Sequence, residues 1–291
     1  MAQPTCMPGL NTHCHTAVRQ LLTTARGNGL DLVRIRGATV VAARGHAGQR
    51  RCSGEPFIAH PLAVAHATAH LGGCTADVET GLLHDLLEDC CGVSVEDVLQ
   101  RFGPLVTDRL LALTKRPDLP KPLRPGEAHG RLVSALGRCG TGLALVKLLD
   151  RAHNAATSAV LSPERLQRLR AENHHFFAPL AHRVGALGLA AFLVAEPQRW
   201  WLAADDFPTH MRQIQPPLTQ GLSAWCPDVP NTDIRSPGLA TRAPAARQRT
   251  ASPASHVSLH AIARLRSPGC GPTVDGTGQF QCTAPPCQPR K

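Results

Sequence analysis

Apolar residues recur through the first two thirds of the chain at intervals of three and four positions, the spacing of amphipathic helices. Alternating apolar and polar positions, which would indicate strands, are scarce. Helices are expected over residues 17–25, 30–43, 61–71, 76–87, 94–101, 106–113, 131–136, 143–157, 163–180 and 185–194. The pattern therefore predicts an all-α fold, a helical bundle.

Glycine and proline separate the predicted helices. The stretch 52–56 contains Gly54 and Pro56 and is expected to turn, and Gly103 with Pro104 breaks the chain between two helices. Ser94 and Asp97 have the spacing of a capping box, with aspartate as the acid. Residues 116–128 are rich in proline, lysine and arginine, and we expect a mobile loop there.

The composition divides the chain into three parts. Residues 1–29 form a polar lead-in, and residues 30–204 carry the helical pattern. From about residue 205 proline, serine, threonine, glycine and glutamine dominate, and such a stretch cannot bury enough apolar surface to offset its ordering entropy. We expect residues 205–291 to be a largely disordered tail, in which only 256–265 could form a short helix.

Charge and cysteine content limit the function classes. The net charge of +10 admits phosphorylated small molecules, but basic residues are scattered and aromatic residues make up only 3%, so a nucleic-acid groove is not favoured. No apolar run approaches the about 20 residues that span a bilayer. The 11 cysteines are odd in number and irregularly spaced, with no signal segment, which favours free thiols in a cytoplasmic protein.

Three cysteines in the tail are candidates for binding a zinc ion. They are Cys270, Cys282 and Cys287. No paired Cys-x-x-Cys is present among them, so incidental cysteines are the favoured interpretation.

The densest chemical signal is His84-Asp85 followed by Glu88-Asp89. On one continuous helix His84 and Glu88 would be four residues apart, as would Asp85 and Asp89, so the two pairs would share one side. Leucines surround them and indicate burial, and three carboxylates with an imidazole resist burial without a cation. For His84-Asp85 alone, an acidic helix face beside a core histidine is an equally good interpretation.

Two distant residues favour a metal. His60 precedes Pro61 at a predicted helix start, from which an imidazole can reach inward. Asp150 lies in a largely apolar helix that would ordinarily exclude an unpaired carboxylate. With His84 and Asp85 these residues make a ligand set of two nitrogens and two oxygens.

The segments around these residues resemble the HD superfamily, and more closely the hydrolase domain of the RelA/SpoT family, also found as stand-alone small alarmone hydrolases. One block is Gly-Gln-Arg-Arg-Cys-Ser-Gly-Glu-Pro-Phe-Ile-Ala-His-Pro at 48–61, and another is Gly-Leu-Leu-His-Asp-Leu-Leu-Glu-Asp at 81–89. Further blocks lie at 102–103, 114–115, 146–154 and 178–185. The resemblance covers about residues 30–193, without the synthetase domain of the long family members.

The resemblance implies hydrolysis of the 3′-pyrophosphate of guanosine tetra- or pentaphosphate, which gives GDP or GTP and pyrophosphate. It implies one Mn²⁺ ion held by His60, His84, Asp85 and Asp150. Mixed imidazole and carboxylate ligands independently fit Mn²⁺ or Fe²⁺ better than Mg²⁺ or Ca²⁺. By the same resemblance the catalytic acids, placed to orient or deprotonate the water, are Glu88 and Asp89.

Further residues match the family's nucleotide-holding positions: Arg51, Ser53, Asn154 and Thr157. Lys147 and Arg151 are also candidates for binding the substrate, although a solvated cation on a helix is an equally good interpretation. Cys52 stands where the family usually has lysine, and residues 116–142 match the family poorly. One phosphate-facing cation is therefore missing from the pattern, unless Arg50 takes its place.

Two alternatives remain open at this point. One is an HD phosphohydrolase of another nucleotide, such as a nicotinamide dinucleotide phosphate or a 3′-phosphorylated adenine nucleotide, which the loss of lysine at Cys52 favours. The other is a non-catalytic regulator that binds the alarmone, which the complete set of ligand and acid positions disfavours. The sequence does not determine the oligomeric state.

Overall fold

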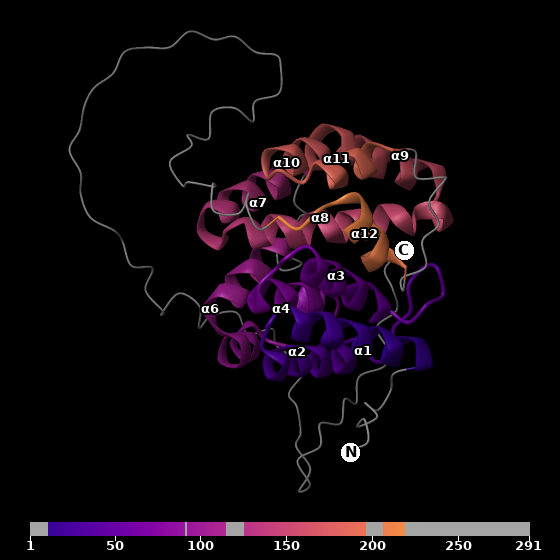
Figure 1. Ribbon diagram of the computed structural model, residues 1–291. Coiled ribbons are helices and arrows are strands. Elements are labelled where there is room, and N and C mark those ends of the chain that lie inside the picture. Colours follow the sequence, from indigo (N-terminus) through magenta and orange to yellow (C-terminus); the bar gives the residue numbers. More distant parts are fainter. Residues whose placement is uncertain (1–10, 91, 115–124, 196–205, 219–291) are drawn as a thin grey trace, which may run out of the picture. The chain divides into compact units, whose positions relative to one another are not determined.

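The computed structural model describes residues 11–90, 92–114, 125–195 and 206–218, all of which belong to one structural unit. Every regular element within these ranges is a helix, and the one β-type pairing is an isolated bridge between Arg50 and Pro56. The predicted all-α class is confirmed for the described part of the chain (Figure 1).

The first group of helices, drawn in indigo to magenta in Figure 1, precedes residue 114. These helices are α1 (Thr12–Gly27), α2 (Leu32–Gly45), α3 (Ala59–His70), α4 (Thr75–Leu83), α5 (Leu86–Asp89) and α6 (Val95–Leu113).

The second group follows the gap at 115–124. It comprises α7 (Pro125–Cys139), α8 (Thr141–Ala156), the 3₁₀ turn η1 (Ser158–Val160), α9 (Pro163–Glu172), the π-helical turn η2 (Asn173–Phe177), α10 (Ala178–Arg183), α11 (Leu187–Val194) and α12 (Phe207–Ile214).

Helix α3 lies at the centre of the unit and packs against α1, α4, α8 and α12. Its residues from His60 to Ala69 are all buried, and many are alanines, which let neighbouring helices approach closely. A Cβ atom added at Gly81 of α4 would lie only 3.1 Å from the Cα atom of Ala65. This close approach packs the last turn of α4 against the middle of α3.

The apolar core has two parts, and α3 contributes to both. One part joins α3 to α1, α2, α4 and α6, and the other joins it to α7, α8, α10, α11 and α12. Helix α8 is buried along most of its length, from Thr141 to Ala156. Polar side chains on α3 and α8 are consequently held inside the protein rather than at its surface.

Several predicted boundaries are confirmed. Ser94 and Asp97 form the predicted capping box: the Asp97 N–H donates to the Ser94 hydroxyl, and the Ser94 N–H donates to the Asp97 carboxylate. The predicted break at Gly103 is a kink in α6, where the glycine has a φ of 82° that residues with side chains rarely adopt.

Other predicted boundaries are corrected. The helix expected over residues 76–87 is interrupted: α4 ends at Leu83 and α5 begins at Leu86, so His84 and Asp85 occupy a turn between them. Residues 125–128, expected in a mobile loop, belong to α7, because the segment continues without a break into an amphipathic helix. The rest of that loop lies outside the described residues.

The folded unit extends beyond the predicted range 30–204 at both ends. Helix α1 falls in the expected lead-in, yet it packs on α2 and α3 through buried residues such as Leu21. Helix α12 falls in the expected tail, yet Phe207 and Met211 are fully buried in the core. These two apolar residues are four apart on one helix face, a signal that the polar composition around them conceals.

The segment after α12 is also attached to the core. The Leu218 N–H donates to the Leu71 carbonyl across 3.0 Å, and the Gln215 side chain accepts from the Gly188 N–H at the start of α11. The predicted helix at 256–265 and Cys270, Cys282 and Cys287 lie outside the described residues.

Three of the described cysteines are free thiols, in agreement with the prediction: Cys52, Cys74 and Cys139. Among the described helices none is long and apolar enough to cross a membrane.

Candidate metal centre

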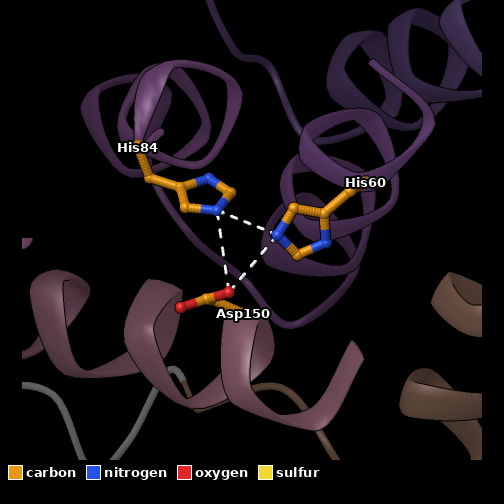
Figure 2. Close-up of side chains that lie close together, drawn as sticks. All are labelled: His60, His84 and Asp150. Atoms are coloured by element: carbon orange, nitrogen blue, oxygen red, sulfur yellow. Dashed lines mark hydrogen bonds and ion pairs between the residues drawn. The ribbon is translucent and has the colours of Figure 1, made fainter. Parts of the chain in front are cut away.

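Three buried side chains from three helices converge at the centre of the unit (Figure 2). His60 lies in the first turn of α3, His84 directly follows α4, and Asp150 lies on the buried helix α8. Each offers one atom that could bind a metal, and these three atoms all lie within 4.8 Å of one another. His84 and Asp150 follow His60 by 24 and 90 positions in the chain, and folding brings all three to one point.

The distances between the three atoms are short. Nε2 of His60 lies 3.0 Å from Nε2 of His84, and Oδ1 of Asp150 lies 3.3 Å from the first and 3.7 Å from the second. Two ligands about 2.1 Å from one ion, and separated by an angle between the octahedral and tetrahedral values, lie about 3.0–3.4 Å apart. The distances of 3.0 and 3.3 Å fall in this range and the distance of 3.7 Å lies slightly above it, so the spacing of these atoms suits ligands of one ion.

Asp85 borders the same point from a less buried side. Its Oδ2 lies 3.2 Å from Nε2 of His84 and 3.6 Å from Nε2 of His60. Its side chain is 23% exposed, whereas those of the two histidines are 3% exposed. The turn between α4 and α5 allows consecutive residues His84 and Asp85 to face the same point. The structure thus brings together all four residues that the sequence proposes as ligands.

The orientation of His84 is fixed from behind. Its Nδ1 lies 2.8 Å from the Gly81 carbonyl, which can only accept, so Nδ1 carries a proton and donates it. In the neutral ring Nε2 then has a lone pair directed at His60 and Asp150. A backbone carbonyl behind the ring is a common arrangement for histidines that bind metals.

The electrostatics of the cluster favour a positive charge at its centre. Burial opposes protonation of His84, but the carboxylates of Asp85 and Asp150 outweigh burial and raise its pKa to about 10. Burial lowers the pKa of His60 to about 4. Burial also opposes ionisation of Asp150, but the positive charge of Lys147 and hydrogen bonds from the imidazoles hold its pKa well below the ordinary value. The donor set fits a divalent cation, which would displace the proton from His84.

Glu88 and Asp89 lie on the short helix α5 beside the centre. Their backbone N–H groups donate to the Asp85 carbonyl across 3.1 and 2.9 Å, so α5 is hydrogen-bonded to the residue that borders the centre. Glu88 is half-buried and Asp89 is exposed. The side chain of Gln49 donates to the Asp89 carbonyl across 2.9 Å and ties α5 to the loop before α3. The catalytic role of Glu88 and Asp89 stays a prediction.

Arg51, in the loop between α2 and α3, reaches α8. Its Nη2 donates to Oδ1 of Asn154 across 2.8 Å and to the Thr157 hydroxyl across 3.4 Å. Ser53 donates to the Glu55 carboxylate of the same loop across 3.3 Å. The structure therefore brings together three residues predicted from separate segments as nucleotide-binding residues, namely Arg51, Asn154 and Thr157.

Lys147 and Arg151 have partners of their own. Nζ of Lys147 lies 2.7 Å from Oδ2 of Asp150, the carboxylate oxygen not directed at the imidazoles. The Arg151 guanidinium contacts Glu172 and the Asn173 side chain, and it lies 4.7 Å from the centroid of the Phe177 ring. Arg151 is thus held toward α9 and η2.

A family model for the HD domain matches residues 38–187. The chain belongs to the HD-domain family. The matched range contains His60, His84, Asp85 and Asp150, and it stops short of α12. The resemblance inferred from the sequence is confirmed.

The chain is similar to bacterial proteins of the RelA/SpoT type. It is 39% identical over 143 residues to a probable guanosine-3′,5′-bis(diphosphate) 3′-pyrophosphohydrolase of Synechocystis sp., covering 48% of this chain and 19% of the relative. It is 35% identical over 155 residues to the bifunctional (p)ppGpp synthase/hydrolase SpoT of Escherichia coli K12, covering 52% and 22%. The chain spans about a fifth of the length of these relatives.

A solved structure is also similar to the chain. It comes from work titled as describing a metazoan ortholog of SpoT that hydrolyses ppGpp. The TM-score is 0.41 and the sequence identity 20%, with coverage of 62% of this chain and 94% of the other.

The HD domain also holds a residue that sequence reasoning missed. His153 is fully buried, and its Nδ1 lies 3.0 Å from Nδ1 of His60 and 3.1 Å from Nη1 of Arg51. Burial lowers the pKa of His153 well below its ordinary value. A signal was available in the sequence, because His153 follows Asp150 by three residues and so lies on the same side of α8.

Proposed function

We propose that this HD domain is a divalent-metal-dependent hydrolase that removes the 3′-pyrophosphate of guanosine 3′,5′-bis(diphosphate) or its pentaphosphate. The products are GDP or GTP and pyrophosphate. The observation that carries the proposal is the convergence of one atom each from His60, His84 and Asp150 within 4.8 Å. Arg51 lies close by, because it and His60 contact the same nitrogen of His153. The names of the RelA/SpoT relatives support the substrate.

The ion is proposed to be Mn²⁺, held by His60, His84, Asp85 and Asp150. Two imidazoles with two carboxylates suit Mn²⁺ or Fe²⁺ better than Mg²⁺, which prefers oxygen ligands and retains its waters. When bound, such an ion activates water and neutralises negative charge on phosphoryl oxygens.

Glu88 and Asp89 are proposed to transfer the proton of the attacking water. Hydrolysis forms a bond between the water oxygen and the phosphorus, and it breaks the bond from that phosphorus to the 3′ oxygen of the ribose. A carboxylate on α5 accepts the proton that the water loses, and the resulting carboxylic acid gives that proton to the 3′ oxygen as it leaves. Half-buried Glu88 is better shielded from bulk water than exposed Asp89, and we assign it the larger share of this role.

Arg51, Ser53, Asn154 and Thr157 are proposed to hold the nucleotide. The planar guanidinium of Arg51 can stack on a base or bind a phosphate through two N–H groups. Asn154 and Thr157 fix its position from α8. The ion pair of Lys147 with Asp150 supports the ligand set, so we place Lys147 behind the ligands rather than on the substrate.

A second candidate is an HD phosphohydrolase of another nucleotide, such as NADPH or a 3′-phosphorylated adenine nucleotide. Cys52 favours it, because an exposed thiol stands where the RelA/SpoT pattern has a lysine. A neutral side chain there weakens the attraction for the four or five phosphates of an alarmone more than for substrates with fewer.

A panel assay tests both candidates. The full chain is incubated with Mn²⁺ and with guanosine tetraphosphate, NADPH or a 3′-phosphorylated adenine nucleotide, and released pyrophosphate and phosphate are measured. We expect pyrophosphate from the guanosine compound. Rates should be at least a hundredfold lower for Glu88→Gln, since general base catalysis contributes about 10²–10⁴-fold, and for Asp85→Asn, which removes a proposed ligand of the ion. The exposed Glu164 on α9 supplies the control Glu164→Gln, which should keep full activity.

Robust turnover by the Asp85→Asn/Glu88→Gln double variant would refute the proposed mechanism. Release of phosphate from an adenine nucleotide alone would favour the second candidate. Tight binding of the guanosine compound without hydrolysis in Mn²⁺ would instead indicate a regulator that senses the alarmone.

A further inference from the structure

His153 connects three elements through one nitrogen atom. It lies on α8 with none of its surface exposed, and its Nδ1 faces two neighbours at hydrogen-bonding distance. One neighbour is Nη1 of Arg51, from the loop before α3, at 3.1 Å. The other is Nδ1 of His60, from α3, at 3.0 Å.

The chemistry of these neighbours assigns the protons. A guanidinium can only donate, so Nδ1 of His153 must hold a lone pair that accepts from Arg51. A neutral His153 then carries its proton on Nε2. Because Nδ1 of His60 faces the same lone pair, it must donate as well. The remaining nitrogen of His60, Nε2, is consequently left with its lone pair directed at His84 and Asp150.

The opposite nitrogen of His153 has a different environment. Its Nε2 is buried and has no hydrogen-bond partner among the described residues. The ring of Phe207, fully buried at the start of α12, packs against the imidazole with the centroids 4.8 Å apart and the planes at 78°. An aromatic ring is a tolerable neighbour for an N–H group that lacks an acceptor. Phe207 lies outside the range that the HD family model matches.

We propose that His153 is a positioning residue for the metal centre. It fixes the proton of His60 on Nδ1, keeps Nε2 of His60 available to the ion, and is itself held in place by Phe207 of α12. The inference rests on the proposed function only in that His60 binds a divalent metal. It adds that a helix beyond the matched family segment takes part in building the centre.

Two amide substitutions separate the roles of the two nitrogens. Asparagine places its polar atoms near the position of Nδ1 and can still accept from Arg51 and His60, whereas glutamine extends to the position of Nε2. Binding of Mn²⁺ to each metal-free full chain is measured by calorimetry, without nucleotide. We expect His153→Asn to stay within a few-fold of the unaltered chain and His153→Gln to bind roughly 10- to 100-fold more weakly, the usual effect of losing an outer-shell partner of a metal ligand.

Two further variants give controls. His66→Leu replaces another buried histidine on α3, away from the centre, and should leave Mn²⁺ affinity unchanged. Phe207→Leu keeps the site apolar but loses the flat ring, and it should weaken binding a few-fold. The visible absorption of bound Co²⁺ checks the geometry: His153→Gln should alter the spectrum and His153→Asn should preserve it. Far-UV circular dichroism verifies that each chain is folded.

The inference is overturned if folded His153→Gln binds Mn²⁺ as tightly as the unaltered chain, or if His153→Asn is as weak as His153→Gln. If the panel assay finds no hydrolysis but His153→Gln still weakens Mn²⁺ binding, the positioning role stands and the proposed substrate fails. If the unaltered chain binds no Mn²⁺, both fail.

Discussion

Asn154 and Asp150 lie one helical turn apart on α8, and Nδ2 of Asn154 donates to Oδ1 of Asp150 across 2.7 Å. This is the carboxylate oxygen that also faces the two imidazoles. The other end of the amide, Oδ1 of Asn154, accepts from Arg51. Since a guanidinium only donates and a carboxylate only accepts, the two ends of the amide cannot be exchanged. One side chain therefore joins the nucleotide loop to a proposed metal ligand.

Asn154→Ala should accordingly impair the substrate complex. Hydrogen bonds to charged groups contribute about 1.5–3 kcal/mol, so losing the bond from Arg51 should raise KM by about tenfold or more. Steady-state kinetics at saturating Mn²⁺ give the value, and Glu164→Gln is the control. Unchanged kcat/KM in Asn154→Ala would mean that Arg51 does not depend on this amide.

Metal removal should lower both activity and stability. A ligand that binds only the folded chain at 100 times its Kd stabilises it by about 2.7 kcal/mol. Chelation should therefore abolish hydrolysis and lower the Tm, and Mn²⁺ should restore both. In Asp150→Asn, Mn²⁺ should leave the Tm almost unchanged, because that residue supplies one of the three converging atoms. An equal Tm shift in the variant and the unaltered chain would contradict the assignment.

Cys52→Lys should improve binding of a highly phosphorylated guanosine nucleotide. Cys52 is exposed, so the added ammonium can reach solvent and phosphate without burial. A gain of about 1 kcal/mol, typical of an exposed charge pair, corresponds to a KM roughly fivefold lower, and the gain should shrink at high salt. Cys52→Ala controls for loss of the thiol. A KM that is insensitive to all three residues at position 52 would show that this position does not face phosphate.

The sequence was sufficient to predict which side chains gather at the centre, and insufficient to predict the contacts that support them. Residue type, order and an apolar environment single out His60, His84 and Asp150, because buried groups of this kind need a cation. The break after Leu83 could not be predicted, since His84 and Asp85 keep helical backbone angles and no glycine or proline stands at this point of the sequence. Spacing from Asp150 indicates the side of α8 on which His153 lies, but its proposed role depends on a contact with His60, 93 positions away, which this spacing does not predict.

Helix α12 was missed for a related reason. An isolated helix of eight residues is marginal in water, so its own sequence gives little signal. Two buried side chains, Phe207 and Met211, and the bonds made by Gln215 and Leu218 stabilise it in the folded chain. Tertiary contacts, rather than helix propensity, determine this element.

Stability should depend on pH through His66, which lies on the opposite half of α3 from the metal centre. The imidazole is 7% exposed, its Nε2 lies 3.0 Å from the Thr24 hydroxyl, and burial lowers its pKa to about 3. The unfolded chain, with an ordinary histidine pKa of about 6.5, takes up this proton first as the pH falls. The stability present at pH 7 is therefore lost progressively below pH 6.5, down to about pH 3.

Between pH 7 and pH 5 the loss from His66 should be about 2 kcal/mol. His66→Gln retains a group that can pair with Thr24 but cannot titrate, so its free energy of unfolding should fall less over this interval. Urea unfolding at several pH values measures the difference. Parallel pH profiles for the two chains would contradict the assignment.

The hydrogen bond from the Leu218 N–H to the Leu71 carbonyl also affects how the chain folds during synthesis. Domains generally begin to fold from the N-terminus as the chain emerges from the ribosome. In this chain the helix that covers His153 and packs on α3 is made after all the proposed metal ligands. His153 therefore lacks its contact with Phe207 until α12 has been synthesised, so the last support of the centre is added after all of its proposed ligands.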